Sequence, residues 1–154
     1  MKKLLLTGFV TFGKYARNPT EIICDFLDSK KLGGYEIYTI IFGTDIHGNA
    51  QQFGKLVIEE VKRLNIDMIL SLGLSSEVKG FRFEKRCINW AENEKYCTAT
   101  EHKTKLNKNH QKNKRYKTDI TEEKFQLVKA ILQKKYIPCE EEISQNANNY
   151  CSNA

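Results

Sequence analysis

The first predicted element of this chain is Lys3-Leu4-Leu5-Leu6-Thr7-Gly8. A short apolar run that ends at a glycine is typical of a buried first strand in an α/β domain. Asn18-Pro19-Thr20-Glu21 then predicts the start of a helix, because Asn18 can cap it and Pro19 loses no hydrogen bond at the first helical position. An apolar stripe follows, formed by Ile22, Ile23, Phe26 and Leu27.

The next stretches repeat this alternation. The β-branched and aromatic run Tyr35 to Phe42 predicts a second strand, and a helical apolar period predicts a helix from about Asp45 to Leu64. Asp67 to Leu72 predicts a third strand, which Gly73 closes. Strands that alternate with helices imply right-handed crossovers. The predicted fold class is therefore α/β, a mostly parallel twisted sheet with helices on both faces.

The second half of the chain is less regular. Phe81 to Asn89 alternates as a strand, with Arg82, Glu84 and Arg86 on one face. Trp90 to Thr118 has no pattern and is long for an internal loop. Thr121-Glu122-Glu123 opens a helix before Pro138, and Cys139 to Ser144 is a further candidate strand. The predicted buried side of that helix consists of Phe125, Val128, Ile131 and Leu132.

Composition narrows the possible functions. The 154 residues fit one domain, and the net charge of +6 comes from one segment, 102–117, which holds seven Lys and Arg residues and no Asp or Glu. That segment offers only Tyr116 for base stacking, so a nucleic-acid partner is not the first expectation. The three histidines are scattered, and the glycines form no phosphate-binding loop, so no metal and no cofactor is predicted.

The five cysteines show no ligand spacing, and the apolar run after Met1-Lys2-Lys3 is too short for a signal peptide. No stretch reaches the length of a membrane span. We therefore expect reduced thiols, a cytoplasmic location and no membrane partner.

Four stretches, taken in order, carry a family resemblance. They are Leu6-Thr7-Gly8-Phe9-Val10-Thr11-Phe12-Gly13 with Asn18-Pro19-Thr20, Leu72-Gly73-Leu74 with Phe83-Glu84-Lys85 and Asn89, Tyr116-Lys117-Thr118-Asp119-Ile120, and Ile143-Ser144-Gln145-Asn146-Ala147 with Tyr150 and Cys151. Together they resemble pyroglutamyl peptidase I, also called pyrrolidone-carboxylate peptidase. This family of cysteine peptidases removes an N-terminal pyroglutamate.

The resemblance implies a phosphorylase/hydrolase-like α/β fold without its C-terminal elements. Residues 1–154 would then form a single, incomplete peptidase-like domain, with 90–118 as a long basic loop or insertion. It also implies a thiol hydrolase that acts on pyroglutamyl peptides, in which a Cys–His pair is oriented by an acid. The resemblance is compatible with either a monomer or an oligomer.

The resemblance also assigns site residues. Glu84 corresponds to the family's acid, Phe9 and Phe12 to the aromatics around the lactam ring, and Leu74 to the glycine turn beside the substrate. Cys151 corresponds to the nucleophile, or Ser152 if the alignment has no gap.

The family's catalytic histidine has no counterpart at His47, His102 or His110, so we expect a truncated or degenerate peptidase without activity. The alternative is a non-catalytic binding or interaction protein that contacts acidic partners or nucleic acid through the Lys-rich loop.

Overall fold

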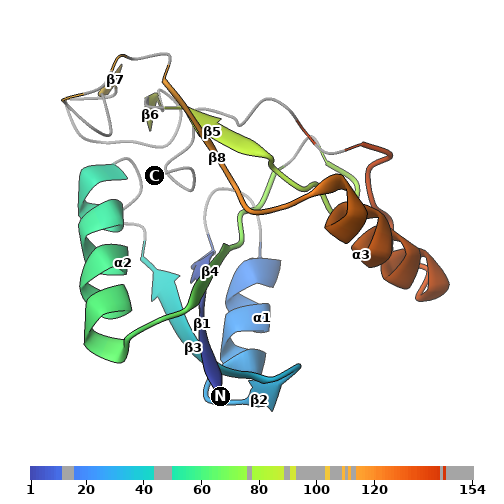
Figure 1. Cartoon of the computed structure of the whole chain (residues 1–154), viewed down its shortest axis with the longest axis horizontal. Helices are drawn as coiled ribbons and strands as arrows, with labels where there is room; N and C mark the ends of the chain where they lie inside the picture. Colours follow the sequence, from blue (N-terminus) through green and yellow to red (C-terminus); the bar gives the residue numbers. More distant parts are fainter. Residues whose placement is uncertain are drawn as a thin grey trace.

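A four-stranded sheet forms the first half of the molecule (Figure 1). The structure, a computed structural model, describes residues 1–11, 16–43, 50–75, 78–88, 91–92, 103–104, 109, 111, 114–142 and 144. The strand order is β2-β3-β1-β4, in which β1 (Lys2–Phe9) pairs in parallel with β3 (Tyr35–Phe42) and β4 (Met68–Ser71). The short β2 (Lys31–Leu32) runs antiparallel to β3 at one edge. The predicted α/β class with a mostly parallel sheet is confirmed.

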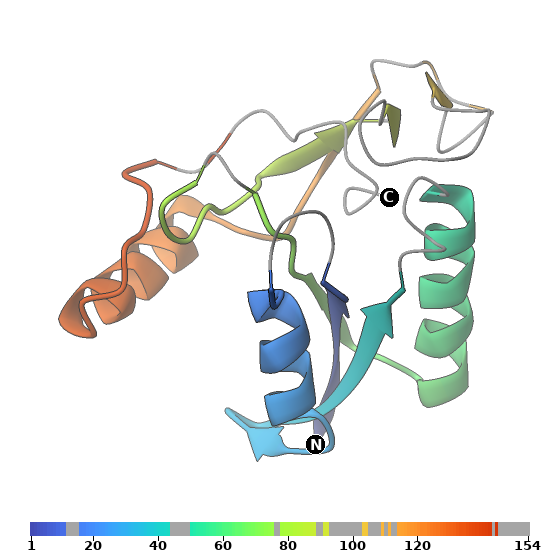
Figure 2. The ribbon, with the colours of Figure 1, turned by 180° about the vertical axis from the view of Figure 1, so that it is seen from behind.

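Two helices cover opposite faces of this sheet, α1 (Pro19–Leu27) and α2 (Ala50–Leu64) (Figures 1 and 2). Alternate residues of β1 supply the two cores, because successive strand side chains point to opposite faces. One core holds Leu5, Phe9 and Phe42 with Phe53 and Val57 of α2. The other holds Leu4, Leu6 and Ile37 with Cys24 of α1.

The start of α1 is fastened to the end of β1. Asn18 caps the helix as predicted, with its side chain accepting from the backbone N–H of Thr20 at 3.0 Å. The Thr20 hydroxyl accepts from the Phe9 N–H at 3.0 Å, and the Asn18 amide donates to the Val10 carbonyl at 3.2 Å. Both side chains are buried, so these bonds satisfy backbone groups that water cannot reach.

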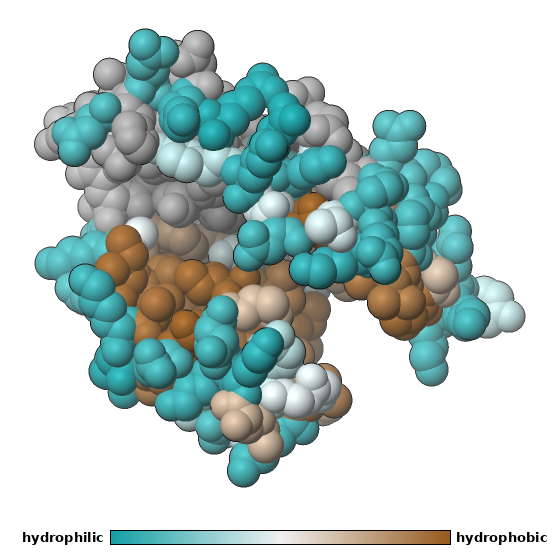
Figure 3. All heavy atoms as spheres, in the orientation of Figure 1, coloured by the Kyte–Doolittle hydropathy of each residue, from teal (hydrophilic) through white to brown (hydrophobic). Residues whose placement is uncertain are grey.

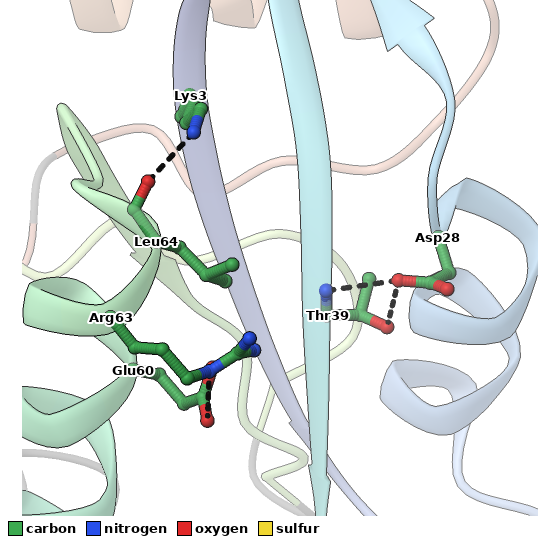
Figure 4. Close-up of polar contacts among 6 residues, drawn as sticks. All are labelled: Lys3, Asp28, Thr39, Glu60, Arg63 and Leu64. Carbon is green, nitrogen blue, oxygen red and sulfur yellow. Dashed lines mark hydrogen bonds and ion pairs between the residues drawn. The ribbon is translucent and has the colours of Figure 1, made fainter.

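The other ends of the helices are fastened as well (Figure 4). Lys3 of β1 donates through Nζ to the Leu64 carbonyl at 2.8 Å, which places a cation at the C-terminus of α2, where the helix dipole favours it. Asp28, after α1, accepts from the backbone N–H and the hydroxyl of Thr39 in β3 at 3.1 and 2.9 Å. Arg63 pairs with Glu60 within α2 on the exposed surface.

A second group of elements lies beyond the carboxyl ends of the parallel strands (Figures 1 and 2). Here β5 (Arg86–Ile88) pairs antiparallel with β8 (Arg115–Lys117), followed by α3 (Glu122–Lys134). Within 90–118, a short pair joins β6 (Ala91–Glu92) to β7 (Lys103–Thr104). Glu84, Ser144 and α3 belong to this group, which we call the upper lobe and define as the described residues from 78 to 144.

Several boundaries differ from the sequence predictions. The strand predicted from Phe81 is regular only from Arg86, with isolated bridges at Phe81 and Glu84, and Asn89 lies outside the described residues. The candidate strand 139–144 likewise makes only the bridges from Cys139 and Ser144. The predicted start of the second helix, 45–49, also lies outside the described residues, and the described part begins at Ala50.

Two predicted apolar faces are only partly buried. Ile131 of α3 is 52% exposed, so its predicted burial is wrong, and Phe125 is the α3 side chain that is fully buried. On α1, Ile22 and Phe26 are exposed, whereas Ile23 and Leu27 pack against the core beside Cys24. The inward face of α1 is therefore centred on Cys24 and Thr20, a small residue pair that lets the helix approach β1 closely.

Candidate functional site

Glu84 lies between two segments that are distant in the sequence. On one side it bridges Ser144 in parallel register, with the Ser144 N–H donating to the Phe83 carbonyl at 2.9 Å and the Lys85 N–H donating to the Ser144 carbonyl at 3.0 Å. On the other side the Thr118 hydroxyl donates to the Glu84 carbonyl at 3.1 Å. The backbone around Glu84 is therefore held from both edges.

Helix α3 packs against the segment that carries Glu84. Thr121 caps the helix by accepting from the Lys124 N–H, and Phe125 packs edge-on against Phe83, with 5.6 Å between the ring centroids. At the start of the segment, Gly80 lies so close to Pro138 that an added Cβ would fall 2.4 Å from the Pro138 carbonyl oxygen. The absence of a side chain at Gly80 lets the two chains meet.

The Glu84 carboxyl has an unusual environment. Its Oε2 atom is buried and has no hydrogen-bond partner within the part of the chain that the structure describes. Burial raises the pKa of Glu84, whereas a hydrogen bond from Ser144 and the charge of Arg82 lower it, and the charge of Glu140 raises it further. The net direction of the pKa shift is upward, so the Ser144 hydrogen bond and the charge of Arg82 offset the desolvation only in part.

Arg82 also binds a second carboxylate, that of Glu140. Its guanidinium binds Glu140 through two hydrogen bonds of 2.8 Å, a bidentate pair that also lowers the pKa of Glu140. The sequence places Arg82 on the same strand face as Glu84, and an acidic run from Glu140 to Glu142 lies within the candidate strand 139–144. The opposite charges of that run and of the basic segment 82–86 are the sequence signal that could have predicted this contact.

The raised pKa of Glu84 predicts how stability depends on pH. Between the ordinary value of 4.5 and its raised value, the folded protein holds this proton more tightly than the unfolded chain. Its contribution to the free energy of unfolding is therefore full below pH 4.5 and declines as the pH rises through that window. We expect the stability of Glu84→Gln to increase relative to the wild-type protein as the pH rises, which urea unfolding at a series of pH values measures.

Glu140→Gln is the matched control with the opposite sign. Because Arg82 lowers the pKa of Glu140, the stability from this carboxylate is present above pH 4.5 and is lost as the pH falls. The two variants should therefore differ from the wild-type protein with opposite pH trends. If both variants show the same pH trend, burial does not dominate the pKa of Glu84.

Of the other predicted site residues, some lie in the described part of the chain and some lie outside it. Phe9 ends β1 and is only 7% exposed, stacked on Phe53 at 5.8 Å and tilted against Phe42 at 5.7 Å between ring centroids. Leu74 is half-buried just after β4, at the same carboxyl edge of the sheet. Phe12, Cys151 and Ser152 lie outside the described residues. Among the described residues, the predicted acid Glu84 lies beside Ser144, which precedes the predicted nucleophile in the sequence.

Cys24 and Cys139 are free thiols that differ from a catalytic cysteine. Burial raises the pKa of Cys24 to about 11 and also raises the pKa of Cys139, so neither resembles an activated nucleophile. The described residues contain no cluster of three potential metal ligands. Among the described helices, none has the length and apolar character needed to cross a bilayer.

Comparisons with known proteins agree on one family. The chain is 30% identical over 89 residues to the pyrrolidone-carboxylate peptidase of Thermococcus litoralis, 35% over 89 residues to that of Oceanobacillus iheyensis, and 41% over 75 residues to that of Lysinibacillus sphaericus. These matches cover 58%, 58% and 49% of this chain, and 39%, 43% and 35% of the relatives. No family model matches the chain.

The solved structures extend the likeness to nearly the whole chain. The crystal structure of the pyrrolidone carboxyl peptidase from Fervidobacterium islandicum has a TM-score of 0.77 and 26% identity, and it covers 97% of this chain and 68% of its own. The predicted resemblance to pyroglutamyl peptidase I is confirmed. The Thermococcus litoralis structure, at 21% identity, shares the fold with a TM-score of 0.77 over 97% of this chain and 64% of its own.

The motifs that resemble pyroglutamyl peptidase I have clear structural roles in this chain. The segment Asn18-Pro19-Thr20 locks the end of β1 to α1 through buried hydrogen bonds. Thr118, from the segment that begins at Tyr116, holds the backbone at Glu84. Ser144, from the segment that leads to Cys151, pairs with Glu84 from the opposite edge. Three of the resembling stretches thus converge on the same end of the sheet.

Proposed function

We propose that this chain carries a pyroglutamyl-peptidase-like site in which Glu84 is the acid and Cys151, or Ser152 in gapless register, occupies the nucleophile position. One observation carries the proposal. The backbone bridge from Glu84 to Ser144 holds the half-buried Glu84 beside a residue that precedes Cys151 by seven positions in the sequence. The site lies beyond the carboxyl ends of parallel strands, where open α/β sheets usually bind ligands.

The chemistry of such a site requires three partners. A thiolate attacks the carbonyl that joins pyroglutamate to the next residue, and an imidazole takes and returns the proton. A carboxylate orients the imidazole by accepting its second N–H. The Oε2 atom of Glu84, buried and without a partner in the described part of the chain, has the acceptor capacity that this role needs.

The imidazole is the partner that residues 1–154 do not supply, because none of His47, His102 and His110 corresponds to the family's catalytic histidine. The function proposed for these residues by themselves is therefore recognition of the pyroglutamyl group without its hydrolysis. Phe12 and Leu74 would contact the lactam ring together with the small exposed part of Phe9. The core contacts of Phe9 with Phe42 and Phe53 would keep that ring fixed.

Two assays test this proposal. With a fluorogenic pyroglutamyl amide, we expect no turnover above the uncatalysed background. Turnover that disappears in Cys151→Ala would contradict the proposed inactivity. In calorimetric titrations, we expect a pyroglutamyl peptide to bind more tightly than the matching prolyl peptide, which lacks the lactam carbonyl. If neither peptide binds and neither is cleaved, the proposed site is wrong.

A further inference from the structure

The two segments that meet at Glu84 differ in length between their two backbone bridges. These bridges join Phe81 to Cys139 and Glu84 to Ser144, both in parallel register. From the first bridge to the second, one segment advances three residues and the other advances five, so 139–144 has two residues more than its partner. Extra residues in one strand form a bulge, which bends the strand and re-aims the residues that follow it. Here the residue that follows is Ser144, beside Glu84.

Lys129 of α3 binds the backbone within this bulge. Its ammonium donates to the Glu141 carbonyl at 3.1 Å and to the Glu141 carboxylate. The Lys129 side chain is only 12% exposed, and its Nζ lies 6.0 Å from the centre of the Phe125 ring. A charge so nearly buried costs free energy unless it is paired and hydrogen-bonded. The contacts with Glu141 therefore explain how a lysine is accommodated at this position.

Lys129 differs in this respect from other lysines of α3. Figure 3 shows a largely hydrophilic surface around α3, and Lys124 and Lys134 are exposed. The Glu141 carboxylate is itself 84% exposed, and an ion pair with such a partner contributes little. The bond to the Glu141 carbonyl is the more informative contact, because it fixes the main chain of the bulge rather than a surface side chain.

Arg82 binds the residue at which the bulge begins. Its guanidinium donates to both carboxylate oxygens of Glu140, and both side chains are half-buried. The Glu140 N–H also donates to the Phe81 carbonyl at 2.9 Å. Glu140 is therefore fixed through its backbone and its side chain, and Lys129 fixes the next residue, Glu141.

We propose that Lys129 and Arg82 are positioning residues that hold this bulge, and that the bulge sets where Ser144 lies relative to Glu84. The inference rests on the proposed function, in which Ser144 precedes the nucleophile position Cys151 by seven residues. Ser144 also acts on the acid directly, because its hydrogen bond to Glu84 opposes the effect of burial on the pKa of Glu84. A displaced Ser144 should therefore raise that pKa.

Hydrogen exchange of the ligand-free protein tests the positioning role. Lys129→Met keeps an apolar side chain of similar length and removes the charge. We expect the amides of Ser144 and Lys85, which form the second bridge, to exchange about tenfold faster, because a hydrogen bond to a charged group contributes roughly that factor. The Phe81 amide, in the first bridge, should keep its wild-type rate. Lys134→Met makes the same change at an exposed position of α3 and should affect neither bridge.

The carboxyl signal of Glu84 gives a readout that a loss of helix stability alone would not move in the folded protein. Isotope-labelled glutamate makes this signal visible by NMR, and its absence from Glu84→Gln assigns it. We expect the pKa of Glu84 to be higher in Lys129→Met than in the wild-type protein, because the displaced Ser144 no longer donates to it. Lys134→Met should leave that pKa unchanged.

Glu141→Gln and Glu142→Gln provide a second comparison if Lys129→Met fails to fold. Each removes one negative charge from an exposed side chain, but Glu141 is the one that binds Lys129. We expect Glu141→Gln to accelerate exchange of the Ser144 amide by about twofold, as suits a weak surface ion pair, and Glu142→Gln to leave it unchanged. Equal acceleration at both bridges in Lys129→Met, the same effect in either control, or an unmoved second bridge would overturn the proposal.

Peptide binding separates this inference from the proposed function. If the wild-type chain binds the pyroglutamyl peptide, Lys129→Met should weaken that binding several-fold, because the segment after Ser144 belongs to the proposed site. Lys134→Met should not weaken it. Unchanged affinity in Lys129→Met would overturn the link between the bulge and the site. If the wild-type chain binds no pyroglutamyl peptide, the proposed function is wrong, and exchange at the two bridges alone decides whether Lys129 positions Ser144.

Discussion

Replacing Gly8 by alanine is expected to lower the free energy of unfolding by about 3 kcal/mol. An added Cβ at Gly8 would fall 2.8 Å from the Thr20 carbonyl oxygen and 2.8 Å from the Cys24 sulfur. The oxygen belongs to helix backbone and cannot move alone, so β1 and α1 would have to separate. That separation would also stretch the buried bond from the Phe9 N–H to the Thr20 hydroxyl. Urea denaturation gives the change directly.

Gly54→Ala is the matched control for this substitution. Gly54 lies inside α2, and an added Cβ there meets no atom within 4 Å. Alanine lowers the conformational entropy of the unfolded chain and favours the helix, so we expect a gain of about 0.5–1 kcal/mol. The same chemical change should thus have opposite signs at the two positions. A loss at Gly8 no larger than the change at Gly54 would show that α1 has room to move away from β1.

The first half of the fold was predictable because its signals are local. The capping residues Asn18 and Pro19 place the start of α1, and the β-branched run places β3 at Tyr35–Phe42, both as the structure has them. Parallel pairing followed from the alternation of strands and helices. What the pattern could not give is which apolar residues stay exposed. Ile22 and Phe26 are apolar at helical spacing, yet the close approach at Gly8 turns Cys24 and Thr20 inward instead.

The upper lobe was harder to predict because it is held by contacts between distant residues. The segment after Gly80 pairs with residues around Thr118 on one side and Ser144 on the other, and these partners are separated from it by stretches with no periodic pattern. The alternation of residue types along 81–89 therefore predicted a longer strand than the one that forms. Glu84 was identified through the family resemblance, whereas its desolvated environment and the Arg82–Glu140 pair required coordinates.

Phe125→Ala should have the largest effect in the upper lobe. We expect it to lower the free energy of unfolding of the lobe by about 3–5 kcal/mol. Phe125 is fully buried, and it joins α3 to Phe83 in the segment that carries Glu84. The remaining apolar residues of α3 are half-buried or exposed, so they cannot replace this anchor. Leu127→Ala is the control, since Leu127 is 64% exposed and should cost little.

Hydrogen exchange separates local opening from global unfolding in this variant. In Phe125→Ala we expect faster exchange at the amides that join the two segments of the upper lobe, those of Phe81, Lys85, Glu140 and Ser144. The amides of Val10 and Leu72, which bind Phe42 and Thr7 in the sheet, should keep their wild-type rates. Equal acceleration in both groups would mean that the lobe and the sheet unfold as one unit. In that case the position of Glu84 would depend on the whole core rather than on Phe125.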